Sequence, residues 1–423
     1  MQLRHRRGSG LSIAALGTAV IMLTSACATT EGEGASGGDG ALTIGALYPL
    51  TGPLAALGIE QSNGVKLAVE FVNEQGGING KPVKIKFQDA SSSSAAASGV
   101  KRLIDDGVPV VFGTSSSGFS LAASPIAERA KIPYVETGAL NEALVERGFK
   151  YYFRTRSANS QLVQAARDAT AEVIAPGLGK DAGDIKAALV TEDGPFGAEI
   201  NALLKKSIPA AGQKIVSDKS YSGASTKSFA SIIADLKQNK PDVLYWAAFN
   251  ADAIAFWQQS RQARYTPPAV VAFASGPGTP DFLKAFGPQA VDGIFVVDAP
   301  VDVAEGASSA EAAELLARFK KEYKKRFKND VTGNAMVGFN GAWAVLGHAL
   351  AKSTKFSGES VRSVLVKADV PMGSLPDGGG LKFNDKGQNE RVSTALLQWQ
   401  NGKLVTVWPE KLAVAKPAYM PLG

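Results

Sequence analysis

The chain has 423 residues, of which 45% are hydrophobic and 20% charged, which is typical of a globular protein long enough for two lobes. The formal net charge is +6, but Arg4, Arg6 and Arg7 lie in a segment that we expect to be removed, and the remaining 42 basic and 39 acidic residues leave +3. This small charge, with no basic stripe, argues against nucleic acid as a partner.

Residues 1–26 have the pattern of a signal peptide, because a basic start is followed by an apolar run that is short for a membrane span. The run ends in "TSA" and then Cys27, the only cysteine, which resembles a bacterial lipobox. Thr24 departs from that pattern, since an apolar residue is usual there. We expect Cys27 to be lipidated and residues 27–40, which are polar and Gly-rich, to form a flexible linker. The alternative is an ordinary signal peptide with a coincidental Cys.

From Leu42 onward, short β-rich runs alternate with amphipathic segments. In the first set, strands are expected at 42–49, 81–89, 108–113 and 132–137, with helices around 65–72, 100–104 and 120–130. In the second set, strands are expected at 185–193, 213–222, 242–249 and 269–275, with helices at 197–208, 229–236 and 251–263. This rhythm predicts an α/β fold with two parallel sheets and helices on both faces.

The last part of the chain has a different pattern. Long helical patterns occur near 308–328 and 335–352. Asn401-Gly402 then separates two alternating runs, which indicates a hairpin added to a sheet in the antiparallel sense.

Residues for catalysis are scarce. His5 lies in the signal segment, and His348 lies in an apolar helix pattern that favours a packed or helix-end role. The sequence contains no zinc-protease, phosphate-loop or nucleophile-elbow motif and no cluster of metal ligands. We therefore expect no catalytic residue, no metal and no cofactor. A hydrolase that uses a serine of the chain would lack a general base.

A binding site is better supported. "GTSSSG", residues 113–118, lies between an expected strand and an expected helix, where ligands bind in open α/β sheets. Free N–H groups at the helix start favour an anion, and serine hydroxyls can donate as well. The alternative is that a serine only caps its own helix. Later units place turns at the same position, at residues 138–141, 193–196, 249–252 and 275–278, and together these would line one cleft.

The order of these motifs resembles the branched-chain amino-acid-type substrate-binding proteins of ABC transporters. The resemblance rests on "IGALYPLTGPLAALG", "NEQGGING", "SSSSGFSLAASPIAERAKIPYVETGALNEAL", "FRT" and "LKFNDKGQ…QWQNGKLVTVWP", and covers residues 42–409. It implies two Rossmann-like lobes of the type I periplasmic binding proteins, joined by hinge crossovers near 153–159, 296–302 and 371–379. The expected N-terminal lobe is 41–157 plus 300–373, and the C-terminal lobe is 158–299 plus 374–423.

The resemblance also implies which residues bind. Ser117 matches a Ser that holds the ligand carboxylate, whereas Leu140 replaces a Thr and Ser275 lies near the place of an acidic residue that pairs with the ammonium group. Phe196 and Phe249 match aromatic walls, and Leu57 replaces an aromatic residue. Ser91 and Ser116 stand where some relatives have a cysteine pair.

These departures change the expected ligand. A buried ammonium group without an anionic partner costs several kcal/mol, in order of magnitude. We therefore expect a small carboxylate or amide with an apolar or aromatic body. Asp252 could supply a substitute charge, but its position more simply predicts a helix start. The expected ligand-binding residues are Ser116, Ser117, Gly118, Ala139, Leu140, Asn141, Phe196, Phe249, Ser275 and Leu57.

The expected function is that of a lipid-anchored binding protein on the outer face of a bacterial cell membrane. It would capture a small-molecule ligand by lobe closure, as a monomer, and deliver it to an ABC permease with its ATPase. Two alternatives remain open. One is a standard branched-chain amino-acid binding protein with a leucine-like ligand, and the other is a ligand-sensing receptor built on the same fold.

Overall fold

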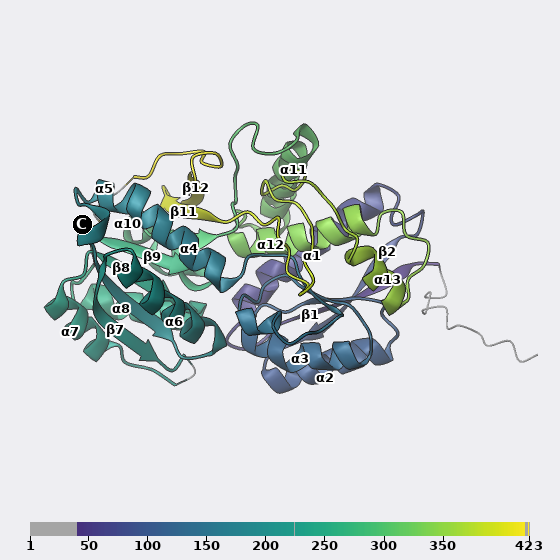
Figure 1. The fold of residues 1–423 in the computed structure, drawn as a ribbon, viewed down its shortest axis with the longest axis horizontal. Coiled ribbons are helices and arrows are strands. Elements are labelled where there is room, and N and C mark those ends of the chain that lie inside the picture. Colours follow the sequence, from purple (N-terminus) through teal and green to yellow (C-terminus); the bar gives the residue numbers. More distant parts are fainter. Residues whose placement is uncertain (1–39, 224, 419–421, 423) are drawn as a thin grey trace, which may run out of the picture. The chain divides into compact units, whose positions relative to one another are not determined.

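The computed structural model of the chain describes residues 40–223, 225–418 and 422 (Figure 1). The predicted signal peptide, Cys27 and almost all of the predicted linker lie outside the described residues. Two sheets organise the described part of the chain, one of five strands and one of seven.

The first sheet is entirely parallel and has the order β2-β1-β3-β4-β5. Its strands are β1 (Leu42–Tyr48), β2 (Val83–Asp89), β3 (Val111–Gly113), β4 (Tyr134–Glu136) and β5 (Tyr152–Arg154). Its helices lie on both faces, with α2 and α3 on one side and α1 and α12 on the other (Figure 1). These and the other elements packed with this sheet are α1 (Ala55–Glu74), α2 (Ser93–Asp105), α3 (Ser117–Arg129), the 3-10 turn η1 (Glu142–Leu144), α11 (Ala310–Phe327), α12 (Gly333–Trp343), the π-helical segment η5 (Ala344–Ala349) and α13 (Gly358–Leu365).

Two glycines allow α1 and α12 to pack closely. A Cβ on Gly64 would lie 2.3 Å from the carbonyl oxygen of Ala335, and a Cβ on Gly338 would lie 2.2 Å from the carbonyl oxygen of Gln61. A larger residue at either position would force the helices apart. This packing brings the start of α12 beside residues in the middle of α1.

The second sheet has the order β12-β11-β10-β9-β8-β6-β7, and only its last two strands in sequence, β11 and β12, pair in the antiparallel sense. Its strands are β6 (Lys186–Glu192), β7 (Lys214–Tyr221), β8 (Val243–Ala247), β9 (Ala269–Phe273), β10 (Phe295–Asp298), β11 (Ala395–Gln400) and β12 (Lys403–Trp408). The predicted hairpin at Asn401-Gly402 is therefore confirmed. The hairpin joins the sheet through the β10–β11 pair.

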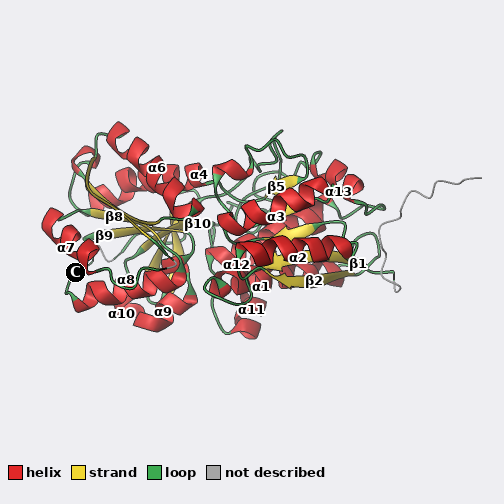
Figure 2. Ribbon diagram, turned by 90° about the horizontal axis from the view of Figure 1, so that it is seen from below, coloured by secondary structure: helices red, strands yellow, loops and turns green. Residues whose placement is uncertain are grey.

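Helices cover both faces of this sheet as well, with α4 and α6 on one side and α8, α9 and α10 on the other (Figure 2). The helical elements of this part are α4 (Asn159–Ala169), the π-helical η2 (Thr170–Ile174), α5 (Ala175–Gly177), η3 (Ala182–Asp184), α6 (Pro195–Ala210), α7 (Ala230–Asn239), α8 (Asn250–Gln262), η4 (Gly276–Gly278), α9 (Pro280–Phe286) and α10 (Pro288–Val291). The α/β fold with mostly parallel sheets is thus confirmed. Within the described residues, every helix is too short or too polar to span a membrane.

The apolar cores follow the two sheets. One core contains residues of β1 together with α11, α12 and α13, and it also includes Leu375, Leu381 and Phe383. Two others flank the seven-stranded sheet. The chain passes between the sheets three times, and hydrogen bonds join two of these passages: Gln388 Nε2 donates to the carbonyl oxygen of Arg156 at 2.8 Å, and the Ser157 and Thr394 hydroxyls lie 2.6 Å apart.

Candidate functional site

The serine loop begins where β3 ends. Gly113 is required there, because a Cβ would lie 2.1 Å from the carbonyl oxygen of Leu47. Ser116 is the N-cap residue of α3, yet its side chain makes no cap hydrogen bond. Among the described residues, the N–H groups of Ser117, Gly118 and Phe119 have no acceptor. The start of α3 therefore presents unpaired N–H groups and a hydroxyl that helix capping does not use.

Ser117 connects this loop to the next one. Its Oγ accepts hydrogen bonds from the N–H groups of Leu140 at 3.3 Å and Asn141 at 3.2 Å. The hydroxyl oxygen is thus occupied, and its proton is what Ser117 can offer to a ligand.

Glu136 forms hydrogen bonds to both of these loops, the one after β3 and the one after β4. Its buried carboxylate accepts from the N–H groups of Thr114, Gly138 and Ala139, each at 2.8 Å, and from the Thr114 hydroxyl at 3.2 Å. Burial raises the pKa of Glu136 to about 7, although its hydrogen bonds act in the opposite direction. An acid that sequence reasoning missed therefore fixes the backbone of both loops.

A narrow cavity lies in front of these loops, and its volume of about 10 Å³ is too small for an organic ligand. A ligand can therefore enter only if the walls separate. Seven of the ten predicted ligand-binding residues line it: Leu57, Ser116, Ser117, Leu140, Phe196, Phe249 and Ser275.

The other three predicted residues lie beside the cavity without lining it. Gly118 is the second residue of α3. Ala139 is buried in a core of the first sheet. Asn141 is engaged on several sides, since its Nδ2 donates to the carbonyl oxygen of Pro195 at 2.7 Å and its Oδ1 accepts from the N–H of Ala143 at 2.9 Å.

Two phenylalanines form the aromatic wall. Phe196 comes from the first turn of α6 and Phe249 from the N-cap of α8, and their ring centroids are 5.6 Å apart. Asp252 does not line the cavity; its Oδ2 accepts from the Tyr221 hydroxyl at 2.6 Å and from the N–H of Phe249 at 3.3 Å. As expected from its position, Asp252 lies in the first turn of α8.

Six further residues line the cavity: Gln61, Ser115, Gly138, Arg156, Ala274 and Asn334. Ser115 and Gly138 belong to loops that the sequence predicted to line the cleft, whereas the other four were not predicted. Gln61 belongs to the run "EQSN", residues 60–63, which is wholly buried in α1 despite being polar. Such a run inside an otherwise apolar helix face was the signal available in the sequence. Arg156 is the only ionisable side chain among the described residues that line the cavity, and no carboxylate is among them.

Comparisons with known proteins agree with this geometry. A family described as "Periplasmic binding protein" matches residues 41–403, which is most of the chain. The chain belongs to the periplasmic binding protein family. Members of this family are substrate-binding proteins and not enzymes.

Two kinds of relatives support this assignment. The Leu/Ile/Val-binding protein homolog 8 of Brucella abortus is 35% identical over 375 residues, which are 88% of this chain and 92% of that protein. The structure of LivJ of Streptococcus pneumoniae, a branched-chain amino acid transporter substrate-binding protein in complex with isoleucine, has a TM-score of 0.74 at 21% identity and covers 89% of this chain and 100% of its own. A solute-binding protein of an ABC transporter from R. palustris, in complex with benzoate, has a TM-score of 0.71 at 25% identity and covers 89% and 98%.

A wider groove of this periplasmic binding protein lies elsewhere. It runs along α4 and the segments 305–309, 372–378 and 408–412, and it contains none of the predicted ligand-binding residues. Its lining also has no buried side-chain polar atom without a partner among the described residues, whereas the narrow cavity has three. Of these two cavities, the narrow one is therefore the one whose lining contains unpaired buried polar atoms.

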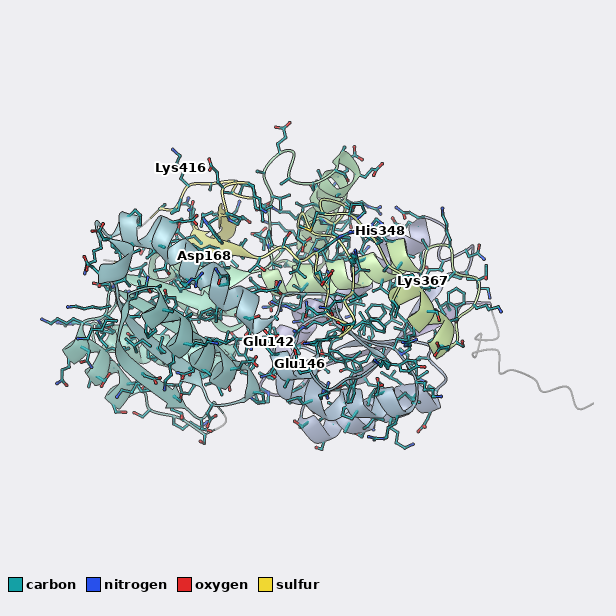
Figure 3. All side chains as sticks on the ribbon, in the orientation of Figure 1. Glu142, Glu146, Asp168, His348, Lys367 and Lys416 are labelled. Atoms are coloured by element: carbon teal, nitrogen blue, oxygen red, sulfur yellow. The ribbon has the colours of Figure 1, made fainter. Side chains whose placement is uncertain are left out.

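His348 lies away from both cavities, in η5, with its ring centroid 6.2 Å from that of Trp343. Figure 3 shows His348 on the segment that follows α12, well separated from Glu142 on the η1 turn. Burial lowers the pKa of His348. Within the described residues, no group of three or more His, Cys, Asp or Glu side chains could hold a metal ion.

Proposed function

We propose that this periplasmic binding protein captures a small carboxylate with an apolar or aromatic body in the narrow cavity. The start of α3 supports this, because its unpaired N–H groups and the non-capping hydroxyl of Ser116 offer several donors to one anion. Phe196, Phe249, Leu57 and Leu140 line the same cavity and offer apolar contact. The observation that carries the proposal is the uncapped start of α3 beside this apolar wall.

The lining of the cavity contains no carboxylate, and this favours a carboxylate ligand without an amino group over a leucine-like ligand. An amino acid would place its ammonium group in a cavity whose one ionisable side chain is a cation, Arg156. That arrangement leaves the ammonium group unpaired, at a cost of several kcal/mol in order of magnitude. The benzoate bound to the R. palustris protein is a carboxylate of the proposed class.

We further propose that two lobes close on this ligand. The N-terminal lobe is 41–157 together with the segment that starts at 300, and the C-terminal lobe is 158–299 together with the β11–β12 hairpin. Because Leu375, Leu381 and Phe383 pack in the core of the first sheet, we place the third crossover between Gln388 and Ala395, beyond the predicted boundary at residue 374.

Delivery to an ABC permease and its ATPase from a lipid-anchored, monomeric state completes the proposal. The signal-peptide and lipobox patterns of residues 1–27 support an anchor on the outer face of the membrane. Intact mass of the protein from the membrane fraction tests this: a diacylated Cys27 as first residue is expected, and an unmodified Cys27 or cleavage elsewhere would overturn the anchor.

A thermal-shift panel tests the ligand class, because a ligand that binds only the folded state raises Tm. We expect benzoate and branched short-chain carboxylates to raise Tm, and leucine, isoleucine and valine to leave it unchanged. Stabilisation by leucine or valine, with none by carboxylates that lack an amino group, would favour the branched-chain amino-acid alternative.

A further inference from the structure

Three side chains that line the narrow cavity each have a buried polar atom without a hydrogen-bond partner. These atoms are Gln61 Nε2, Arg156 Nε and Asn334 Oδ1. None of these residues is more than about one-twentieth exposed, with Gln61 at 0%, Asn334 at 1% and Arg156 at 5%. Buried polar groups are normally paired, so their gathering at one cavity calls for a ligand group.

Gln61 is held in place with its amide at the cavity. The amide oxygen accepts from the Ser115 hydroxyl at 3.1 Å. The amide lies against Gly138, where a Cβ would approach both amide atoms to within 2.6 Å. The side chain thus depends on a glycine for its position, and its Nε2 remains as a free donor.

Arg156 offers a donor without bringing an unpaired charge. Its Nη2 donates to Asp298 Oδ1 at 2.8 Å and its Nη1 donates to the carbonyl oxygen of Gly138 at 3.2 Å. Asp298 is buried as well, so the ion pair is neutral as a unit. The remaining Nε–H can therefore bond to a neutral oxygen as readily as to an anion.

Asn334 supplies the acceptor. It is the second residue of α12, and its Nδ2 donates to Glu60 Oε2 at 3.3 Å. Glu60 also accepts from the Thr332 hydroxyl at 3.0 Å, which fixes the carboxyl beneath the amide. Asn334 Oδ1 is left to accept from a group in the cavity.

We propose that Gln61, Arg156 and Asn334 form a second polar subsite, which takes a hydroxyl or carboxamide carried on the body of a carboxylate ligand. This inference rests on the proposed function, in which the carboxylate itself binds at the start of α3. A hydroxyl or carboxamide both accepts and donates, so it can pair with the two donors and the one acceptor together. The aromatic wall comes from α6 and α8, whereas the subsite comes from α1, α12 and the crossover after β5.

A site built to hydrogen-bond a hydroxyl rejects the analogue that lacks it, because its own buried groups are then left unpaired. Isothermal titration on the purified chain should therefore compare benzoate with 2-, 3- and 4-hydroxybenzoate and 4-carbamoylbenzoate. The same titrations should compare an aliphatic parent acid, 4-methylpentanoate, with its hydroxylated form, 2-hydroxy-4-methylpentanoate. We expect at least one substituted acid to bind 10-fold or more tightly than its parent.

Gln61→Leu removes the amide, and it should reduce that preference to less than 3-fold. Asn334→Ala is the second variant, which serves if Gln61→Leu fails to fold. The matched control is Gln213→Leu, because Gln213 is also a buried glutamine with an unpaired amide but lies outside the cavity. The control should keep the wild-type preference.

The outcomes separate the two proposals. Equal affinity for parent and substituted acids, which is expected if the three atoms bind only water, overturns the second subsite and leaves the carboxylate proposal standing. An unchanged preference in both Gln61→Leu and Asn334→Ala also overturns the subsite. Binding of leucine with no binding of any acid in the panel overturns the proposed function and this inference together.

Discussion

Arg156 and Asp298 form a buried ion pair, with Nη2 and Oδ1 2.8 Å apart. Arg156 follows β5 and Asp298 ends β10, so the pair joins the two passages that leave these strands. Asp298 also accepts from the N–H of Ala299 at 2.8 Å. These two passages and the narrow cavity therefore share one side chain, because Arg156 also lines the cavity.

Removing one member of this pair should be costly. Asp298→Asn leaves the guanidinium buried without a counter-charge, and we expect the free energy of unfolding to fall by about 3–5 kcal/mol. Urea unfolding followed by circular dichroism measures this loss. The control is Lys101→Ala, which breaks the exposed Lys101–Asp105 pair and should change stability by less than about 0.5 kcal/mol. Equal effects of the two substitutions would contradict the role given to the Arg156–Asp298 pair.

Ser116 and Ser92 provide a matched test of binding against capping. Both are N-cap residues, but Ser92 Oγ accepts from the N–H of Ala95 at 3.1 Å, whereas the Ser116 side chain makes no such bond. We expect Ser116→Ala to raise the Kd for benzoate about 10-fold, since a hydrogen bond to a charged group contributes roughly 1.5–3 kcal/mol, with little change in stability. Ser92→Ala should cost about 1 kcal/mol of stability and leave Kd unchanged.

Titration calorimetry and urea unfolding on both variants decide this. A stability loss in Ser116→Ala equal to that in Ser92→Ala, with an unchanged Kd, would show that Ser116 serves the helix and not the ligand.

The sequence predicted most of the fold because local patterns were clear. Alternating runs and helical periodicity gave the main strands and helices of both sheets, and Asn401-Gly402 gave the hairpin. The strands β5 and β10 were not predicted, because most of their residues were assigned to the crossovers near 153–159 and 296–302.

The missed part of the site depends on contacts between distant segments. Gln61 was not predicted, because its burial depends on α12, which is more than 270 residues away in the chain and packs against α1. Arg156 was predicted only as part of a crossover, because its buried ion pair depends on Asp298 at a separation of 142 residues. Motif order placed the serine loop and the aromatic wall, whereas the polar side of the cavity required the packing of α1 against α12.

Asn141 and Pro195 give a third test, on a hydrogen bond that lies beside the cavity. Asn141→Asp keeps an oxygen to accept from the N–H of Ala143 but replaces the donor to the Pro195 carbonyl oxygen by an acceptor. We expect the closed arrangement to lose roughly 1–2 kcal/mol, so the Kd for benzoate should rise about 10-fold. Stopped-flow dissociation should show the change in the off-rate.

The control for this substitution is Asn384→Asp, because Asn384 Oδ1 accepts from the N–H groups of Lys386 and Gln388 within one loop. It should leave both Kd and off-rate unchanged. An unaltered off-rate in Asn141→Asp would mean that its bond to Pro195 does not contribute to closure.

Buried carboxyls predict how stability depends on pH. Burial raises the pKa of Glu60 to about 8, that of Glu136 to about 7 and that of Asp377 to about 6. In the unfolded chain these groups ionise near their ordinary values, so between about pH 5 and 8 the folded protein holds more protons. The free energy of unfolding should therefore be highest near pH 5 and fall as the pH rises to 8, by at most about 1.4 kcal/mol per pH unit for each group.

Glu60→Gln isolates one of these groups, because an uncharged amide has no ionisation to penalise. The slope of unfolding free energy against pH should become shallower by up to about 1.4 kcal/mol per pH unit between about pH 5 and 8. Urea unfolding at five pH values measures this slope. Glu410→Gln, at an exposed position, is the control and should keep the wild-type slope. A slope in Glu60→Gln equal to that of the wild type would mean that the carboxyl of Glu60 ionises in the folded protein as it does in the unfolded chain.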